Sequence, residues 1–188
     1  MKTNTHDEIL NLVDRLARVS SSEHWVGDLN PAQLAALSYL AMANRYSRAP
    51  SQIAEYLSAM RGTVSVTLKA LARKKLIEET KSKTDKRRTS YSITEKGLAS
   101  LDFNTSLGTA LDTMDEGELS KLSGALKTLL KNVLRVRGGR SFGICATCQH
   151  NRNGTNGAYC TLLNVDLKAS QTKQICFEHE RFKPQLSP

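Results

Sequence analysis

Apolar side chains recur every three or four positions along much of this chain, the spacing that places them on one face of an α-helix. The pattern predicts a first amphipathic helix over residues 8–20 and a short third helix over residues 51–57. A second helix is expected to begin after Asn30, because Asn30 can cap it and Pro31 suits a first helical turn. Gln33 can complete a capping box with Asn30. These signals indicate a largely helical N-terminal region.

The fourth predicted helix, residues 61–75, has two unlike faces. Val64, Leu68 and Leu71 follow one another at the spacing of a buried stripe, so this face belongs in a core. The opposite face carries small, weakly charged side chains, whereas solvent-exposed helix faces usually carry long charged ones. Such a face fits closely against the surface of a partner. Its members are Thr63, Val66, Thr67 and Ala70, with Arg61, Ser65 and Lys69 on the flanks.

Two short stretches rich in β-forming residues, 76–80 and 89–94, enclose the basic sequence KSKTDKRR. They predict a two-stranded hairpin with a basic tip. Thr94 can cap a fifth helix, and Asp115 can cap a sixth with a long leucine stripe. The glycine-rich segment 138–143 predicts a hinge after that last helix.

The excess of basic residues makes the helical region a candidate polyanion binder. The chain carries a formal net charge of +9, and residues 61–96 hold eleven Lys and Arg against four Asp and Glu. Such a stretch attracts nucleic acid. A helical interaction domain with a solvated basic face is the alternative interpretation.

The sequence has no pattern typical of a membrane protein, a secreted protein or a common enzyme class. No apolar run approaches the length that spans a bilayer, and the start MKTNTHDEIL lacks the apolar core of a signal peptide. Neither a Walker loop nor a Gly-x-Gly-x-x-Gly motif nor a Ser-His-Asp set is apparent. We therefore expect a cytoplasmic protein that is not an enzyme and does not bind a membrane.

The order of helices and hairpin resembles the MarR family of transcriptional regulators. The matching segments are SQIAEYLSAMRGTVSVTLKALARKKLIEE and TDKRRTSYSITEKG, the second of which is similar to that family's Asp-x-Arg wing tip. The resemblance implies a mainly α fold with a small β-wing, a winged helix-turn-helix dimerised through its terminal helices. It also implies a homodimer that binds a pseudo-palindromic operator in double-stranded DNA, with a possible small-molecule effector at the dimer interface.

By this resemblance the fourth helix enters a major groove and the hairpin tip approaches a minor groove and its phosphates. Asp85 is expected to orient Arg87 through an ion pair. Ser58 stands where the turn of the helix-turn-helix often has Gly, and Met60 is a poor helix cap. The predicted DNA-binding residues are Arg61, Thr63, Ser65, Val66, Thr67, Lys69, Lys86, Arg87 and Arg88.

All four cysteines lie beyond residue 144, as Cys145, Cys148, Cys160 and Cys176. In a reducing cytosol, clustered cysteines indicate metal ligands or redox thiols rather than disulfides. Thiolates are soft ligands that suit zinc or an iron-sulfur cluster. Cys145 and Cys148 can supply two ligands from one turn, a geometry that both kinds of site use.

The spacing of the four cysteines is similar to that of high-potential iron-sulfur proteins. This resemblance implies a 4Fe-4S cluster with all four cysteines as ligands. Structural zinc and metal-free redox thiols remain alternatives, and His150 and His179 are possible substitute ligands. Neighbouring apolar residues are expected to shield the site. They are Ile144, Tyr159, Leu162, Leu163, Ile175 and Phe177.

These patterns divide the chain into a DNA-binding and dimerisation domain, residues 1–137, and a cysteine-rich metal-binding lobe, residues 138–188. A lobe this small is expected to depend on its metal for folding. The leading hypothesis is a transcriptional repressor whose iron-sulfur cluster senses redox state, oxygen or iron. A regulator with a purely structural zinc lobe and a thiol-redox or electron-transfer protein are the alternatives.

Overall fold

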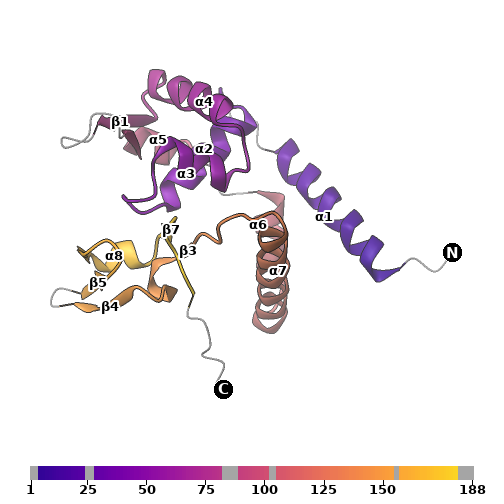
Figure 1. Cartoon of the computed structure of the whole chain (residues 1–188). Helices are drawn as coiled ribbons and strands as arrows, with labels where there is room; N and C mark the ends of the chain where they lie inside the picture. Colours follow the sequence, from indigo (N-terminus) through magenta and orange to yellow (C-terminus); the bar gives the residue numbers. More distant parts are fainter. Residues whose placement is uncertain (1–3, 24–27, 82–88, 102–104, 155–156, 182–188) are drawn as a thin grey trace.

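The computed structural model describes residues 4–23, 28–81, 89–101, 105–154 and 157–181. Figure 1 shows a module of helices and one hairpin lying next to a small strand-rich lobe, while two long helices extend from the module. None of the described helices is long and apolar enough to cross a membrane.

The winged-helix module comprises residues 29–101 and follows the predicted order of elements. Its helices are α2 (Pro31–Met42), α3 (Pro50–Tyr56) and α4 (Arg61–Arg73), followed by the antiparallel strands β1 (Ile77–Lys81) and β2 (Thr89–Ile93) and by α5 (Glu95–Ala99). The predicted caps are confirmed. Asn30 and Gln33 form a capping box at the start of α2, and the Thr94 side chain accepts a hydrogen bond from the Gly97 N–H at 3.0 Å.

The core of the module lies between α2, α3, α4 and the hairpin. Fully buried side chains of α2, α3 and α4 meet there, including Leu37, Ile53 and Leu68. Gly97 lets α5 pack directly on the start of the hairpin, because a Cβ atom at this position would lie 2.2 Å from the Leu76 carbonyl oxygen. This packing fixes the hairpin relative to α4.

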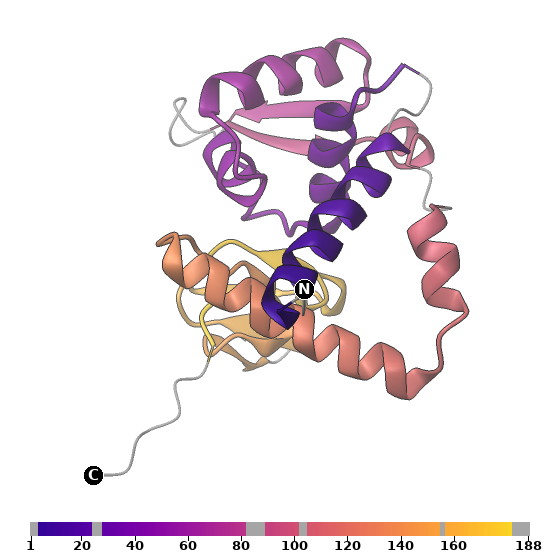
Figure 2. The same cartoon turned by 90° about the vertical axis from the view of Figure 1, so that its right-hand side faces the viewer.

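Helices α1 (Thr5–Ser22) and α7 (Glu116–Val136) extend from this module (Figures 1 and 2). Asp115 caps α7 in a capping box with Glu118, as predicted. A short helix that the pattern did not indicate, α6 (Ser106–Asp112), precedes α7. Neither α1 nor α7 contains a buried residue, so their apolar stripes are exposed in the single chain.

The cysteine lobe, described over residues 138–154 and 157–181, is built largely from short strands. β3 (Gly143–Ile144) pairs with β7 (Ile175–Cys176), and β4 (Asn151–Gly154), β5 (Gly157–Cys160) and β6 (Val165–Leu167) form an antiparallel sheet. A 3-10 turn, η1 (Cys145–Thr147), and a short helix, α8 (Ala169–Thr172), connect these strands.

The lobe is docked on the winged-helix module, which the predicted hinge did not anticipate. Gly138 does end α7, with a positive φ of 65°. Four residues later, however, Phe142 packs against the core of the module, and Ile175 of β7 does the same. Ile175 also forms a bridge with Ala43 at the end of α2. The two units therefore share a contact surface.

Candidate functional site

Helix α4 presents the predicted DNA-binding face to solvent. Val64, Leu68 and Leu71 are buried and anchor the helix in the core. On the other side Arg61, Thr63, Val66 and Lys69 are exposed, and Val66 retains 68% of its accessible surface. An exposed β-branched side chain on a helix with basic flanks can contact thymine methyl groups in a major groove.

Ser65 and Thr67, also predicted to contact DNA, are only half exposed. The Thr67 hydroxyl donates a hydrogen bond to the Thr63 carbonyl oxygen at 3.0 Å. This bond occupies the donor of Thr67 but leaves its oxygen able to accept. The pattern therefore predicted which side of α4 is exposed, although these two side chains are only half exposed, and DNA contact by this face stays a prediction.

The turn before α4 has the geometry of a helix-turn-helix although its sequence is unusual. Ser58 adopts a φ of 51°, in the left-handed region where glycine is favoured. Met60 makes no side-chain hydrogen bond at the N-cap of α4, as expected from its side chain. Met60 is also 79% exposed, next to Arg61 on the predicted DNA-binding side.

The hairpin is anchored through the middle of its two strands. Tyr91 in β2 is buried, and its hydroxyl donates to the Glu79 carboxylate in β1 at 3.1 Å. The predicted wing-tip residues, Asp85, Lys86, Arg87 and Arg88, lie outside the described residues. Their role in DNA binding stays a prediction.

The second candidate site is the cysteine lobe, where three separate segments contribute the four thiols. Cys145 begins η1 and Cys148 follows its end, Cys160 ends β5, and Cys176 ends β7. All four side chains are buried and none forms a disulfide. Three of them, Cys145, Cys160 and Cys176, belong to one small apolar cluster with Ala158 and Leu167.

The apolar shell differs from the expected one. Leu163 packs against the cysteine cluster as predicted, joined by Val165 and by Tyr46 of the winged-helix module. Ile144 and Leu162 are instead exposed, at 41% and 43%.

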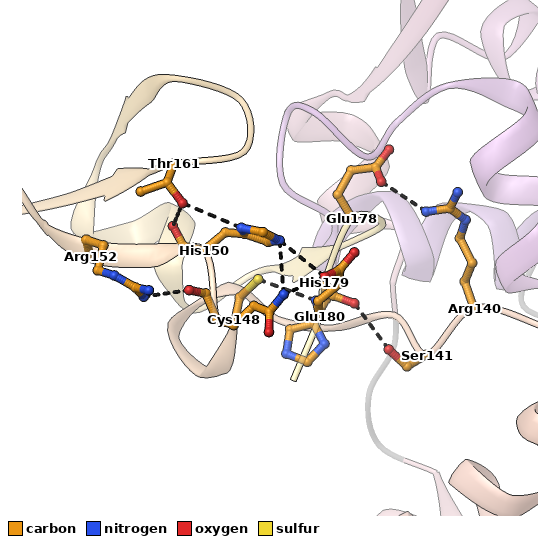
Figure 3. A network of polar contacts seen from close by, with 10 residues as sticks. Arg140, Ser141, Cys148, His150, Arg152, Thr161, Glu178, His179 and Glu180 are labelled. Carbon is orange, nitrogen blue, oxygen red and sulfur yellow. Dashed lines mark hydrogen bonds and ion pairs between the residues drawn. The ribbon is translucent and has the colours of Figure 1, made fainter. Parts of the chain in front are cut away.

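Polar groups point at the sulfur atoms, as they do around metal thiolates. The backbone N–H of Glu180 donates to Cys148 Sγ at 3.4 Å (Figure 3). The Asn151 side-chain amide lies 3.9 Å from Cys145 Sγ and also donates to the Cys145 carbonyl oxygen at 3.0 Å. Such donors stabilise the thiolate form, which is the form that binds metal.

Two of the thiols have raised pKa values as the structure stands. Burial, and then the neighbouring Cys176, Cys148 and Cys160, raise the pKa of Cys145 to about 11, although the hydrogen bond from Asn151 lowers it in part. Burial likewise raises the pKa of Cys176, against hydrogen bonds from Asn44 and from the backbone at Glu178 that lower it. A soft metal cation would favour the thiolate forms by its positive charge.

In ligand type, four buried thiols with N–H donors beside them suit zinc or an iron-sulfur cluster. Among the residues that the structure describes, no group of three or more His, Cys, Asp or Glu side chains is arranged to hold a metal ion as it stands. His179, a possible substitute ligand, is buried, and its Nε2 lies 2.9 Å from the Thr147 hydroxyl. His150 lies 3.3 Å from the Glu180 carboxylate (Figure 3).

Sequence reasoning missed the part of the site that the winged-helix module contributes. Asn44 and Ser47, in the turn between α2 and α3, are each 1% exposed and face the Cys176 segment. The Ser47 hydroxyl accepts a hydrogen bond from the Phe177 N–H at 2.8 Å. No periodic pattern marks these two residues. The one signal in the sequence is that they are polar residues in a short segment between two apolar helices, which could have suggested a buried turn.

A cavity of about 780 Å³ lies between α3, α7 and the segment that enters the lobe. Its wall includes apolar side chains of α7, among them Leu130 and Val133, together with Tyr56 and the basic residues Arg61 and Arg140. The cavity therefore touches α4, α7 and the lobe at once.

Comparisons with known proteins agree with the winged-helix assignment. Residues 29–97 match the family model described as a winged helix DNA-binding domain. In fold the chain is similar to the S. aureus MepR–DNA complex, with 22% identity and a TM-score of 0.54 over 70% of this chain and 99% of that one. S. aureus MepR in its DNA-binding conformation gives 22% identity and a TM-score of 0.55 over 69% of this chain and 98% of that one.

Streptococcus pneumoniae FabT in complex with DNA is also similar, with 23% identity and a TM-score of 0.50 over 70% of this chain and 94% of that one. No curated protein matches the sequence. At these identities the likeness concerns the fold, and the predicted winged helix-turn-helix is confirmed. The residues that match the family model end at residue 97, before the cysteine lobe.

Proposed function

We propose that this chain is a transcriptional regulator that binds double-stranded DNA as a homodimer and whose cysteine lobe holds an iron-sulfur cluster. The cluster makes DNA binding depend on redox state, oxygen or iron supply. The observation that carries the proposal is the docking of a lobe with four buried free thiols directly on a winged-helix module. A passive appendage would not need this contact.

DNA binding is supported by the exposed face of α4 and by the charge of residues 61–96. Arg61 and Lys69 flank the small side chains of that face, so they can reach phosphates while Thr63 and Val66 lie against bases. The solved structures of similar fold include MepR and FabT bound to DNA. The proposed regulator is a repressor.

Homodimerisation is supported by the exposed apolar stripes of α1 and α7. Leu126 and Leu130 of α7 retain 51% and 57% of their surface, and Leu12 and Leu16 of α1 each retain 53%. Two long helices with no buried residue need a partner to remove these stripes from water. A second copy of the chain would also place two recognition helices on one pseudo-palindromic operator.

In this proposal Cys145, Cys148, Cys160 and Cys176 are the cluster ligands. A bound 4Fe-4S cluster would supply a redox-active centre that oxidants can convert or remove. The N–H groups of Glu180 and Asn151 would orient and tune the thiolates. Structural zinc bound by the same cysteines is the alternative.

The test is metal and sulfide analysis of the full chain purified without oxygen. A brown protein with about four iron and four sulfide per chain supports the iron-sulfur lobe. Cys160→Ser should abolish the colour, whereas Thr161→Ala, a control at the neighbouring exposed position, should leave it. A colourless protein with one tightly held zinc would establish the structural-zinc alternative.

The cavity beside α3 and α7 is the candidate place for a small-molecule effector. The cavity lies between α7 and the start of α4, the proposed recognition helix. A bound ligand could therefore change the distance between these two helices.

A further inference from the structure

The turn between α2 and α3 holds Cys176 from both sides. The Asn44 N–H donates to the Ile175 carbonyl oxygen at 2.9 Å, and the Phe177 N–H donates to the Ser47 hydroxyl at 2.8 Å. The residues before and after Cys176 are thus both bound to the winged-helix module. The segment that carries this thiol cannot move without breaking these hydrogen bonds or moving the turn with it.

Hydrogen bonds within the same turn hold its residues together. Ser47 Oγ donates to Asn44 Oδ1 at 2.9 Å, and Asn44 Oδ1 also accepts from the Tyr46 N–H at 3.0 Å. The Tyr39 hydroxyl donates to the Ser47 carbonyl oxygen at 2.6 Å. Asn44, Ser47 and Tyr39 are all buried, so water cannot easily replace a partner that is lost.

The far side of the turn is bound to the wing. The Arg48 carbonyl oxygen accepts a hydrogen bond from the Tyr91 N–H of β2 at 3.1 Å. The Arg48 guanidinium donates to the Ala43 carbonyl oxygen at 2.8 and 3.0 Å, which closes the turn on itself. Helix α3, the first helix of the helix-turn-helix, begins two residues later at Pro50.

We propose that Asn44 and Ser47 are positioning residues that couple the cysteine lobe to the DNA-binding surface. They hold the Cys176 segment on one side, and through Arg48 they hold wing strand β2 on the other. This role rests on the proposed function, since it names the route by which the lobe acts on the module. A change in the position of Cys176, such as metal loss would cause, reaches β2 and the start of α3 through this turn.

The first measurement is amide hydrogen exchange of the full chain by NMR, followed at the Tyr91 N–H. Ser47→Ala removes the hydroxyl that binds Phe177, and Tyr91 should then exchange about fivefold faster, as expected when a buried hydrogen-bonded turn is loosened. The matched control is Ser141→Ala, which removes a hydroxyl bound only within the lobe, to the His179 carbonyl oxygen. It should leave Tyr91 exchange unchanged.

If Ser47→Ala does not fold, Asn44→Ala serves as the second variant, because it breaks the side-chain contact with Ser47 but keeps the hydroxyl. Unchanged Tyr91 exchange in the folded variant would overturn the coupling role. Faster exchange in Ser141→Ala as well would also overturn it, because general loosening of the lobe would then explain the effect.

The second measurement compares duplex affinity of the metal-loaded chain with that of the chelator-treated chain at fixed salt. Wild-type protein should show a ratio of roughly 5 to 150-fold, the usual range of allosteric coupling, and Ser47→Ala should bring the ratio close to one. Wild-type protein that binds no duplex would overturn the proposed function. A metal-dependent affinity that Ser47→Ala leaves intact would overturn the coupling role alone.

Discussion

The ring of Phe142 meets the ring of Tyr56 nearly at right angles, with ring centroids 5.1 Å apart. Phe142 also contacts Tyr39 of α2 and Phe177 of the lobe, so one side chain joins both units. Its φ of 37° lies in the left-handed region, which costs about 1 kcal/mol or more for a residue with a side chain. The aromatic contacts offset this strain and hold the lobe on the module.

Truncating this ring should therefore loosen the docking. We expect Phe142→Ala to lower the free energy of unfolding by about 2 kcal/mol, less than a fully buried Phe loses, because Phe142 is only half buried. Urea denaturation of the full chain measures the loss, and limited proteolysis shows whether the lobe is cut first. Leu162→Ala, at an exposed position of the same lobe, is the control and should change stability little.

The contact at Phe142 also shows where sequence reasoning reaches its limit. Helices and caps were predictable because they depend on neighbours in sequence, and Asn30 and Asp115 cap as expected. The docking of the lobe depends on pairs such as Ser47 and Phe177, which are 130 residues apart. Nothing local to either residue indicates the other, so an independent lobe on a hinge was the natural expectation.

In the candidate sites too, features set by neighbours in sequence were predictable and contacts between distant residues were not. The exposed face of α4 could be predicted from the helical spacing of its apolar residues, because buried Val64 and Leu68 fix which side faces outward. The cysteines identified the lobe, but not the donors around them. Asn151 is six residues from Cys145 and Glu180 is 32 residues from Cys148, so these hydrogen bonds appear only in the folded lobe.

Removing a basic residue from α4 should weaken DNA binding in a salt-dependent way. Lys69→Ala is expected to lower affinity and to reduce the slope of log affinity against log salt by about one, the effect of one lost phosphate contact. Fluorescence anisotropy over a salt series measures both. Lys121→Ala on α7 removes the same charge away from this face, and an equal effect there would show that net charge alone is responsible.

Arg87→Ala tests the predicted wing in the same assay. We expect weaker binding and a slope reduced by about one, because the basic tip is predicted to contact phosphates. An affinity equal to that of wild type would remove the wing from the DNA-binding surface. Asp85→Ala is a useful companion, since its effect should be smaller if Asp85 only orients Arg87.

A charge placed in the α7 stripe should disrupt the homodimer. Leu126 is 51% exposed in the single chain, and Leu126→Glu would place a carboxylate in the proposed dimer interface. Sedimentation analysis should then show a shift toward monomer, with a parallel loss of affinity for a two-half-site duplex. Lys127→Glu, one position away on the polar side, should stay dimeric. Wild-type protein that is monomeric at micromolar concentration would contradict the proposed interface.

Acid should destabilise the lobe through His179. Burial lowers the pKa of His179 below 6.5, with a smaller contribution from Arg181, so the folded state favours the neutral imidazole. The associated stability is present above pH 6.5 and is lost as the pH falls through the lowered pKa. Urea unfolding of the full chain as purified, measured between pH 7.5 and 5, should show this loss. It should be smaller in His179→Gln, and equal pH dependence in both proteins would assign the loss to other groups.

Metal binding should release protons. Burial, and then the neighbouring thiols, raise the pKa of Cys145 to about 11, so this thiol is protonated at neutral pH before metal arrives. Because the bound form is the thiolate, Zn²⁺ added to chelator-treated protein should release up to about four protons per chain if all four cysteines bind. Affinity for Zn²⁺ should accordingly rise with pH. Titration in weak buffer with a pH indicator counts the protons. Cys145→Ser should release fewer, and a count unchanged by that substitution would exclude Cys145 as a ligand.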